Sequence, residues 1–202
     1  GVFSKNYKKK TKLTSMDPLS LHKSLEVLSK NKIKHVILEA SSHGLKQKRL
    51  NFLKIKAGIF TNLSHDHLDY HKDMKDYLCS KLLLFKNLLR EKATVITDTD
   101  TKQYGIIKKI QRKRKLKIFT IGSKSNVFEV LNHKIFKNFQ SLEIKYNKKI
   151  YKLRINLYGS IQIKNLLMAI LASKVCGLKI KNVFDKIEKI KSVEGRLQLI
   201  RT

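Results

Sequence analysis

Short apolar runs recur along the chain at residues 35–39, 57–62, 93–97 and 116–121. The first of these runs ends in an acid, Glu39. Runs of this length are typical of strands that are buried on both faces of a parallel sheet. We therefore predict four strands at these positions.

Between and around these runs, apolar residues recur with helical spacing. Asp17 stands directly before Pro18, which predicts a helix start with an aspartate cap and a proline in the first turn. Leucines at positions 21, 25 and 28 then share one helical face. Further helices are predicted at residues 74–89, near 106–110, at 161–175 and at 180–190.

The segment from about 136 to 157 has a different pattern. Leu142, Ile144 and Tyr146 alternate with polar residues, residues 147–149 resemble a turn, and 150–155 runs back. This pattern predicts an antiparallel hairpin. Because the rest of the chain alternates strands with helices, we predict an α/β fold with a mostly parallel sheet flanked by helices, to which the hairpin is added.

Two polar clusters follow predicted strands. Residues 39–44 read Glu-Ala-Ser-Ser-His-Gly, and residues 61–67 read Thr-Asn-Leu-Ser-His-Asp-His. In open α/β sheets, ligands bind beyond the carboxyl ends of the strands. The two clusters therefore predict one functional site.

The stretch His65-Asp66-His67-Leu68-Asp69-Tyr70-His71 is rich in potential metal ligands. A dinuclear zinc hydrolase would show His-x-His-x-Asp-His, but Tyr70 intervenes before the last histidine and breaks that spacing. A simpler alternative is a polar loop in which His65 and His71 cap the following helix.

Three stretches together support a third interpretation, because their order and spacing resemble those of the central ATPase domain of the Mur ligases. They are Glu39-Ala-Ser-Ser-His-Gly-Leu, Thr61-Asn-Leu-Ser-His-Asp-His-Leu-Asp-Tyr-His and Ser80-Lys81-Leu-Leu-Leu-Phe. Weaker similarity extends over residues 13–198. The resemblance implies Mg²⁺ as cofactor, with Glu39 and His67 as its ligands, and a carbamate formed on Lys81 as the third. These three residues are the predicted catalytic set.

The same resemblance implies residues that contact the muramoyl substrate. Met16 stands where the family has proline after a Thr-Thr pair, and that pair is Thr-Ser here. The predicted substrate-binding residues are Thr14, Ser15, Ser41, Gln47 and Arg49.

Predicted ATP contacts lie elsewhere in the chain. Asn62 follows the second strand, Asn165 belongs to a stretch similar to the family's Gly-x-x-Asn-x-x-Asn, and Arg196 belongs to Val-Glu-Gly-Arg. Gln162 replaces the first Asn of that stretch. Residues 97–100, Thr-Asp-Thr-Asp, are similar to an Asn-x-Asp-Asp loop of the family.

The resemblance assigns residues 1–192 to the ATP-binding domain and 193–202 to a hinge and the start of a further domain. No Gly-x-x-x-x-Gly-Lys-Ser/Thr phosphate loop occurs in the sequence, so the 202 residues alone are expected to be inactive. The implied activity of the parent protein is ATP-dependent addition of a third residue to UDP-N-acetylmuramoyl-L-alanyl-D-glutamate through an acyl phosphate. The expected amine is meso-diaminopimelate, with lysine as the open alternative.

The net charge of +30 at pH 7 invites a different hypothesis, a basic module that binds RNA or DNA. Lysines are spread along the whole chain, however, and no aromatic residues alternate with them in the way that base stacking requires. We therefore expect no nucleic-acid partner. Another Mur ligase or a folylpolyglutamate-type ligase stays open as an alternative within the enzyme class.

Two cysteines, Cys79 and Cys176, show no paired or metal-type spacing, which fits a reducing cytoplasm. No apolar stretch is long enough to span a membrane. The expectation is a cytoplasmic monomer without membrane contact, whose partners are the UDP-muramoyl dipeptide, ATP and a diamino acid.

Overall fold

The computed structural model describes residues 2–4, 7–9 and 15–192. These residues form two compact units. The first combines the described parts of 1–55 with 63–90, and the second combines 56–62 with the described residues from 91 onward. The prediction of a single domain over residues 1–192 and a hinge at 193–202 stays a prediction, and the hinge lies outside the described residues.

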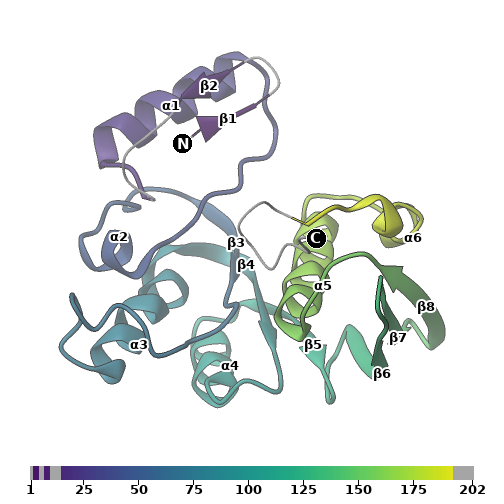
Figure 1. Cartoon of the computed structure of the whole chain (residues 1–202). Helices are drawn as coiled ribbons and strands as arrows, with labels where there is room; N and C mark the ends of the chain where they lie inside the picture. Colours follow the sequence, from purple (N-terminus) through teal and green to yellow (C-terminus); the bar gives the residue numbers. More distant parts are fainter. Residues whose placement is uncertain (1, 5–6, 10–14, 193–202) are drawn as a thin grey trace. The chain divides into compact units, whose positions relative to one another are not determined.

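The first unit is mainly helical (Figure 1). Asp17 caps its longest helix, since its Oδ1 accepts the backbone N–H of Ser20 at 2.9 Å, and Pro18 occupies the first turn as predicted. The elements of this unit are the paired strands β1 (Val2–Phe3) and β2 (Lys8–Lys9), the helices α1 (Pro18–Lys30), α2 (Ser42–Lys46) and α3 (Met74–Leu83), and the π-helical turn η1 (Leu84–Leu88).

The strand predicted at residues 35–39 is wrong, because this segment has no regular structure. Ile37 exposes 89% of its surface and Val36 exposes 45%. An extended apolar segment becomes a strand only when a neighbour pairs with its backbone N–H and C=O groups. Among the described residues no strand pairs with this segment.

The second unit is built on a six-stranded mixed sheet in the order β3-β4-β5-β6-β7-β8. The pairs β4–β5 and β5–β6 are parallel, whereas β6–β7 and β7–β8 are antiparallel. This confirms the predicted α/β class with an added hairpin. The strands are β3 (Ile55–Ile59), β4 (Leu89–Asp98), β5 (Lys117–Gly122), β6 (Phe128–Ile135), β7 (Gln140–Tyr146) and β8 (Lys149–Ile155).

Strand β6 is the element of this sheet that the sequence pattern did not predict. Its pairing with β7 shifts register between Val130 and Asn132. A bulge of this kind adds one residue to a strand, so side chains on either side of it no longer follow a simple two-residue alternation. The hairpin of β7 and β8 has no such shift, so the alternation of its apolar and polar residues predicted it correctly.

The core of the second unit lies between the sheet and helix α5 (Ser160–Val175) (Figure 1). Leu167 and Leu171 on α5 are fully buried, as are Ile144 and Ile155 on the hairpin. The segment 180–190 was predicted as one helix but forms two short ones. The remaining helices of this unit are α4 (Tyr104–Lys113), α6 (Ile180–Phe184) and the 3₁₀ turn η2 (Ile187–Lys189).

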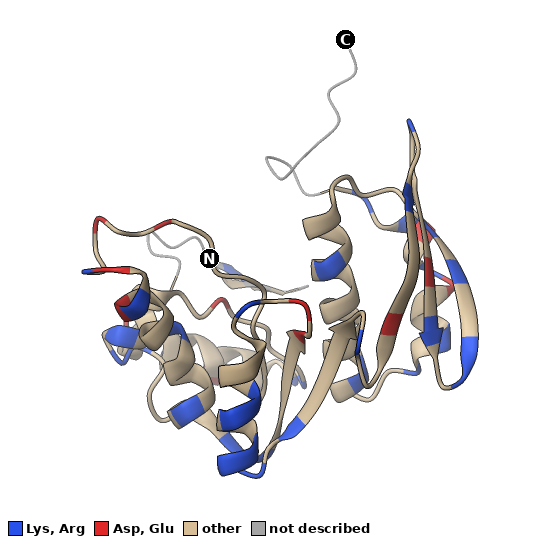
Figure 2. Cartoon of the chain, turned by 90° about the horizontal axis from the view of Figure 1, so that it is seen from below, with Lys and Arg blue, Asp and Glu red and all other residues tan. Residues whose placement is uncertain are grey.

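Lys and Arg residues occur on helices and strands of both units rather than on one element (Figure 2). This distribution agrees with the even spread of lysine in the sequence. Within the described residues, no helix has the length and apolar character needed to cross a membrane.

Candidate functional site

Ser15 holds the segment that carries Glu39. Its Oγ donates to the backbone oxygen of Glu39 at 3.1 Å and lies 2.8 Å from Oγ of Ser41. Ser41 in turn caps α2, because its Oγ accepts the N–H of Gly44 at 3.1 Å. A side chain at Gly44 would place its Cβ 2.7 Å from that of Ser15. This close approach requires glycine there.

Arg49 and Gln47 extend this network. Arg49 Nη1 donates to the backbone oxygen of Ser15 at 2.7 Å, and its other terminal nitrogen donates to Gln47. Gln47 Nε2 donates to the hydroxyl of Tyr70 at 3.1 Å. Four predicted substrate residues, Ser15, Ser41, Gln47 and Arg49, are therefore joined in one network. The fifth, Thr14, lies outside the described residues.

His67 sits on a tight turn of the loop before α3. Its backbone has φ 57°, and its N–H donates to Oδ1 of Asp66 at 2.8 Å. The left-handed conformation is uncommon for residues other than glycine and is enriched at functional sites. Its side chain is half exposed, and its Nε2 lies 3.7 Å from Oδ2 of Asp66.

Five rings gather around this loop. His43 lies 3.8 Å from Tyr70, measured between ring centroids, and 5.4 Å from His67. His71 stacks on Tyr77 at 5.0 Å. Burial lowers the pKa of His43, and the neighbouring His67 and His71 lower it further. The surroundings therefore favour the neutral imidazole of His43.

His71 does not cap α3 as one alternative supposed. The cap is Asp73, whose side chain accepts the N–H of Asp76 at 2.7 Å. His71 is instead buried, with Nε2 2.9 Å from Oγ of Ser42 and Nδ1 3.3 Å from Oδ2 of Asp76. The sequence did not predict this buried, hydrogen-bonded position of His71. Its only indication there is the spacing of four residues between His71 and His67.

Lys81 projects from α3 and is half buried, with Nζ 5.1 Å from the ring centroid of Tyr77. Burial lowers the pKa of Lys81, while the charges of Glu39 and Asp66 offset part of the effect. The two carboxylates are thus close enough to act on the lysine. A larger share of uncharged amine makes Lys81 more nucleophilic than an exposed lysine.

Within the described residues, no three His, Cys, Asp or Glu side chains come close enough to hold a metal ion. Glu39 and His67 are two possible ligands. A third would have to come from another kind of group, and Lys81 is the candidate.

The predicted ATP residues that are described lie in the second unit. Asn62 and Asn165 are both exposed, the latter on the first turns of α5. The third, Arg196, lies outside the described residues. Next to Asn165, Lys164 Nζ pairs with Oδ2 of the buried Asp98 at 2.5 Å. No sequence pattern indicated this pair, which joins residues 66 positions apart.

The loop after β4 is held by hydrogen bonds. Burial alone would raise the pKa of Asp100, but hydrogen bonds from Ser123 and Thr99 and the charge of Lys164 outweigh it, so this pKa is lowered. Gly122 has φ 114°, and a Cβ there would collide with Thr99 and Asp98. The loop is therefore preorganised around carboxylates.

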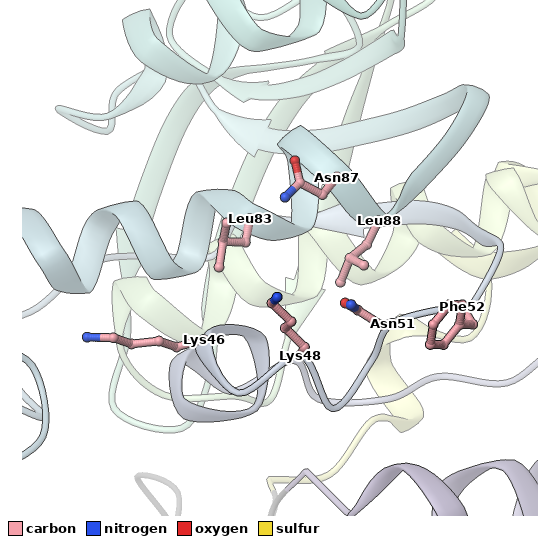
Figure 3. A pocket seen from close by; sticks show the side chains of 7 residues that line it. All are labelled: Lys46, Lys48, Asn51, Phe52, Leu83, Asn87 and Leu88. Atoms are coloured by element: carbon pink, nitrogen blue, oxygen red, sulfur yellow. The ribbon is translucent and has the colours of Figure 1, made fainter.

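A cavity of about 290 Å³, smaller than a second one of about 530 Å³ that Ser15 and Glu39 help to line, lies in the first unit near α2 and the end of α3 (Figure 3). The side chain of Lys48 points into it, whereas Lys46 points away, toward its partner Asp76. None of the predicted site residues lines this cavity. Its lining is Lys46, Lys48, Asn51, Phe52, Leu83, Asn87 and Leu88.

Comparison with known proteins gives consistent matches. A model of the Mur ligase middle domain matches residues 2–173. The UDP-N-acetylmuramoyl-L-alanyl-D-glutamate–2,6-diaminopimelate ligase of Rickettsia montanensis is 34% identical over 188 residues, which cover 93% of this chain and 39% of that protein. The ligase of the same name from Chelativorans sp. is 34% identical over 202 residues, covering 100% and 42%.

A solved structure of a ligase with this same name superposes with a TM-score of 0.82 at 27% sequence identity. The match covers 93% of this chain and 39% of that structure. The chain thus spans about two fifths of the length of the relatives that it matches.

Proposed function

Because the chain belongs to the Mur ligase family, we propose that the protein is an ATP-dependent, amide-forming ligase of peptidoglycan synthesis. The proposed substrate is UDP-N-acetylmuramoyl-L-alanyl-D-glutamate, and the proposed product carries a third residue. Relatives that are 34% identical are named for diaminopimelate as the added residue. The same residue is proposed here.

The observation that carries this proposal is the setting of Lys81. Only an uncharged amine attacks carbon dioxide, and burial disfavours the ammonium of this lysine. Addition of carbon dioxide forms an N–C bond and releases one proton from the amine. The product is a carbamate, so that the uncharged amine becomes a carboxylate-like anion within reach of the Glu39 charge.

The residues present fit a magnesium ion. Magnesium prefers oxygen ligands, which Glu39 and a Lys81 carbamate would supply, and His67 would add a nitrogen. Among the described residues Glu39 has no ion-pair partner, so its carboxylate is available for a cation. When bound, magnesium would neutralise charge on the phosphoryl group that ATP transfers.

The remaining site residues would orient the two substrates. Arg49 would face carboxylate or phosphate groups of the muramoyl dipeptide, with Gln47 and Ser41 beside it. Asn62 and Asn165 would hold ATP. The substrate's glutamate carboxylate would attack the terminal phosphorus of ATP with loss of ADP, and the diamino acid would then displace phosphate from the acyl phosphate.

The proposal includes action in the cytoplasm, as a monomer and without a nucleic-acid partner. Both cysteines are free thiols, as a reducing compartment predicts.

The test is phosphate release from ATP by the protein produced from its whole natural reading frame. The assay contains Mg²⁺, the UDP-muramoyl dipeptide and either meso-diaminopimelate or lysine. We expect release that requires both the dipeptide and one diamino acid. Lys81→Ala should lower the rate on the order of 100-fold or more, because it removes a group that positions charge at the reacting centre.

Lys75→Ala is the matched control, since Lys75 is exposed on the same helix. This variant should keep the full rate. Release that does not depend on the muramoyl dipeptide would contradict the proposal. Turnover with a pteroyl glutamate instead would favour the folylpolyglutamate-type alternative.

A further inference from the structure

The side chain of His71 has no exposed surface, although it lies in a polar loop. Burying an imidazole costs free energy unless its nitrogens form hydrogen bonds. When they do, these bonds fix the positions of the groups around the ring. The partners of His71 come from three different segments. Each of these segments carries one residue of the proposed magnesium site.

The first contact is to α2, where Nε2 of His71 lies 2.9 Å from Oγ of Ser42. Ser42 follows Glu39 by three residues and is itself 3% exposed. The second contact is within the loop, where the N–H of His71 donates to the backbone oxygen of His67 at 3.0 Å. His71 thus touches the segments of both protein ligands.

The third contact is to α3, which carries Lys81. Nδ1 of His71 lies 3.3 Å from Oδ2 of Asp76, and its ring stacks on Tyr77 with an interplanar angle of 23°. Tyr77 also lies under Nζ of Lys81 at 5.1 Å. The ring of Tyr77 therefore lies between His71 and the proposed carbamate position on Lys81.

We infer that His71 is the positioning residue that fixes the segments of Glu39, His67 and Lys81 relative to one another. This inference rests on the proposed function. The Asp76 carboxylate can only accept, so Nδ1 carries a proton and donates to it. Nε2, 2.9 Å from Oγ of Ser42, makes the second hydrogen bond of the ring. The imidazole thus links α2 to α3, while the backbone N–H of the same residue binds the loop at His67.

Three variants separate the parts of this role in the protein of full natural length. His71→Phe keeps a ring against Tyr77 but removes both hydrogen bonds. His71→Asn keeps a donor near the position of Nδ1, and His71→Gln keeps a polar group near Nε2. His133→Phe is the matched control, because His133 also bonds a side chain, Gln140 at 2.8 Å, but belongs to the other unit.

Two readouts are measured beside the thermal midpoint: kcat for ligation, and the NMR signal of a ¹³C-carbamate on Lys81 after incubation with labelled bicarbonate. We expect His71→Phe to lower kcat about 10- to 100-fold, the usual effect of removing an outer partner of a metal site. Its carbamate signal should fall as well. His71→Asn and His71→Gln should each recover part of both, and His133→Phe should change neither.

If His71→Phe keeps kcat and the carbamate signal within about twofold of His133→Phe, the inference is overturned while the proposed function stands. Loss that follows the thermal midpoint alone, and disappears at a temperature where the variant is folded, also overturns it. If the unmodified protein shows neither ligation nor a carbamate, the proposed function fails and this inference fails with it.

Discussion

Single residues in the first unit have chemistry that their type alone does not indicate. Lys81 is one of many lysines in the chain, yet burial lowers its pKa. The pKa of His43 is lowered as well, by burial and by its histidine neighbours. At this scale the surroundings, rather than the residue type, determine which protonation state is available for chemistry.

The lowered pKa of Lys81 predicts its reactivity as a function of pH. At any pH below the ordinary lysine range, a lysine with a lowered pKa has more uncharged amine, so it should acylate at lower pH than exposed lysines. Competitive labelling with acetic anhydride, read by mass spectrometry from about pH 6 to about pH 11, measures this. Lys75 on the same helix is the internal reference.

Labelling of Lys81 should reach half its limiting rate at a lower pH than labelling of Lys75. Identical profiles for the two lysines would show that burial does not act on Lys81. The proposed carbamate would then lose its chemical basis.

At the scale of elements, Asn126 joins strand β5 to the turn that leads into β6. Its Oδ1 accepts the N–H of Thr120 at 2.8 Å and faces the Thr120 hydroxyl at 2.8 Å. Its Nδ2 donates to the backbone oxygen of Ile118 at 2.8 Å. The connection between the parallel strands β5 and β6 contains no helix, and the Asn126 side chain holds it in place.

Asn126→Ala should lower the free energy of unfolding by about 2 kcal/mol, because several hydrogen bonds at about 0.5–1.5 kcal/mol each are lost together. Urea unfolding followed by circular dichroism measures this difference. Lys124→Ala, in the same turn and exposed, should change it by less than about 0.5 kcal/mol. Equal effects of the two variants would contradict the role of Asn126.

At the scale of the whole molecule, the net charge of +30 governs non-specific association. Lys and Arg residues are distributed over both units (Figure 2). A distributed charge of this kind attracts any polyanion at low salt without reading its sequence. This differs from a nucleic-acid-binding site, where cations and stacking rings gather on one face.

We expect double-stranded DNA of two unrelated sequences to bind with equal affinity at about 50 mM salt and to lose on the order of 1000-fold in affinity by about 200 mM. Fluorescence anisotropy over a salt series measures both properties. A sequence preference that persists at the higher salt concentration would favour the nucleic-acid alternative over the absence of such a partner.

Local patterns in the sequence predicted much of the fold. The Asp17 cap, the helices at 18–30 and 160–175 and the hairpin of β7 and β8 depend on contacts between near neighbours, which leave a periodic trace. Strand β6 was missed because its bulge breaks that trace. The family resemblance likewise rests on short motifs, and the chain's membership of the family confirms it.

Tertiary structure alone decided the features that depend on distant partners. Whether the apolar run at 35–39 becomes a strand depends on a neighbour to pair with, and none of the described strands pairs with it. His71 is buried because Ser42, 29 residues away, packs beside it, and Asp98 meets Lys164 across 66 residues. Sequence periodicity records which face of an element is apolar, but it does not record which distant side chain meets that face.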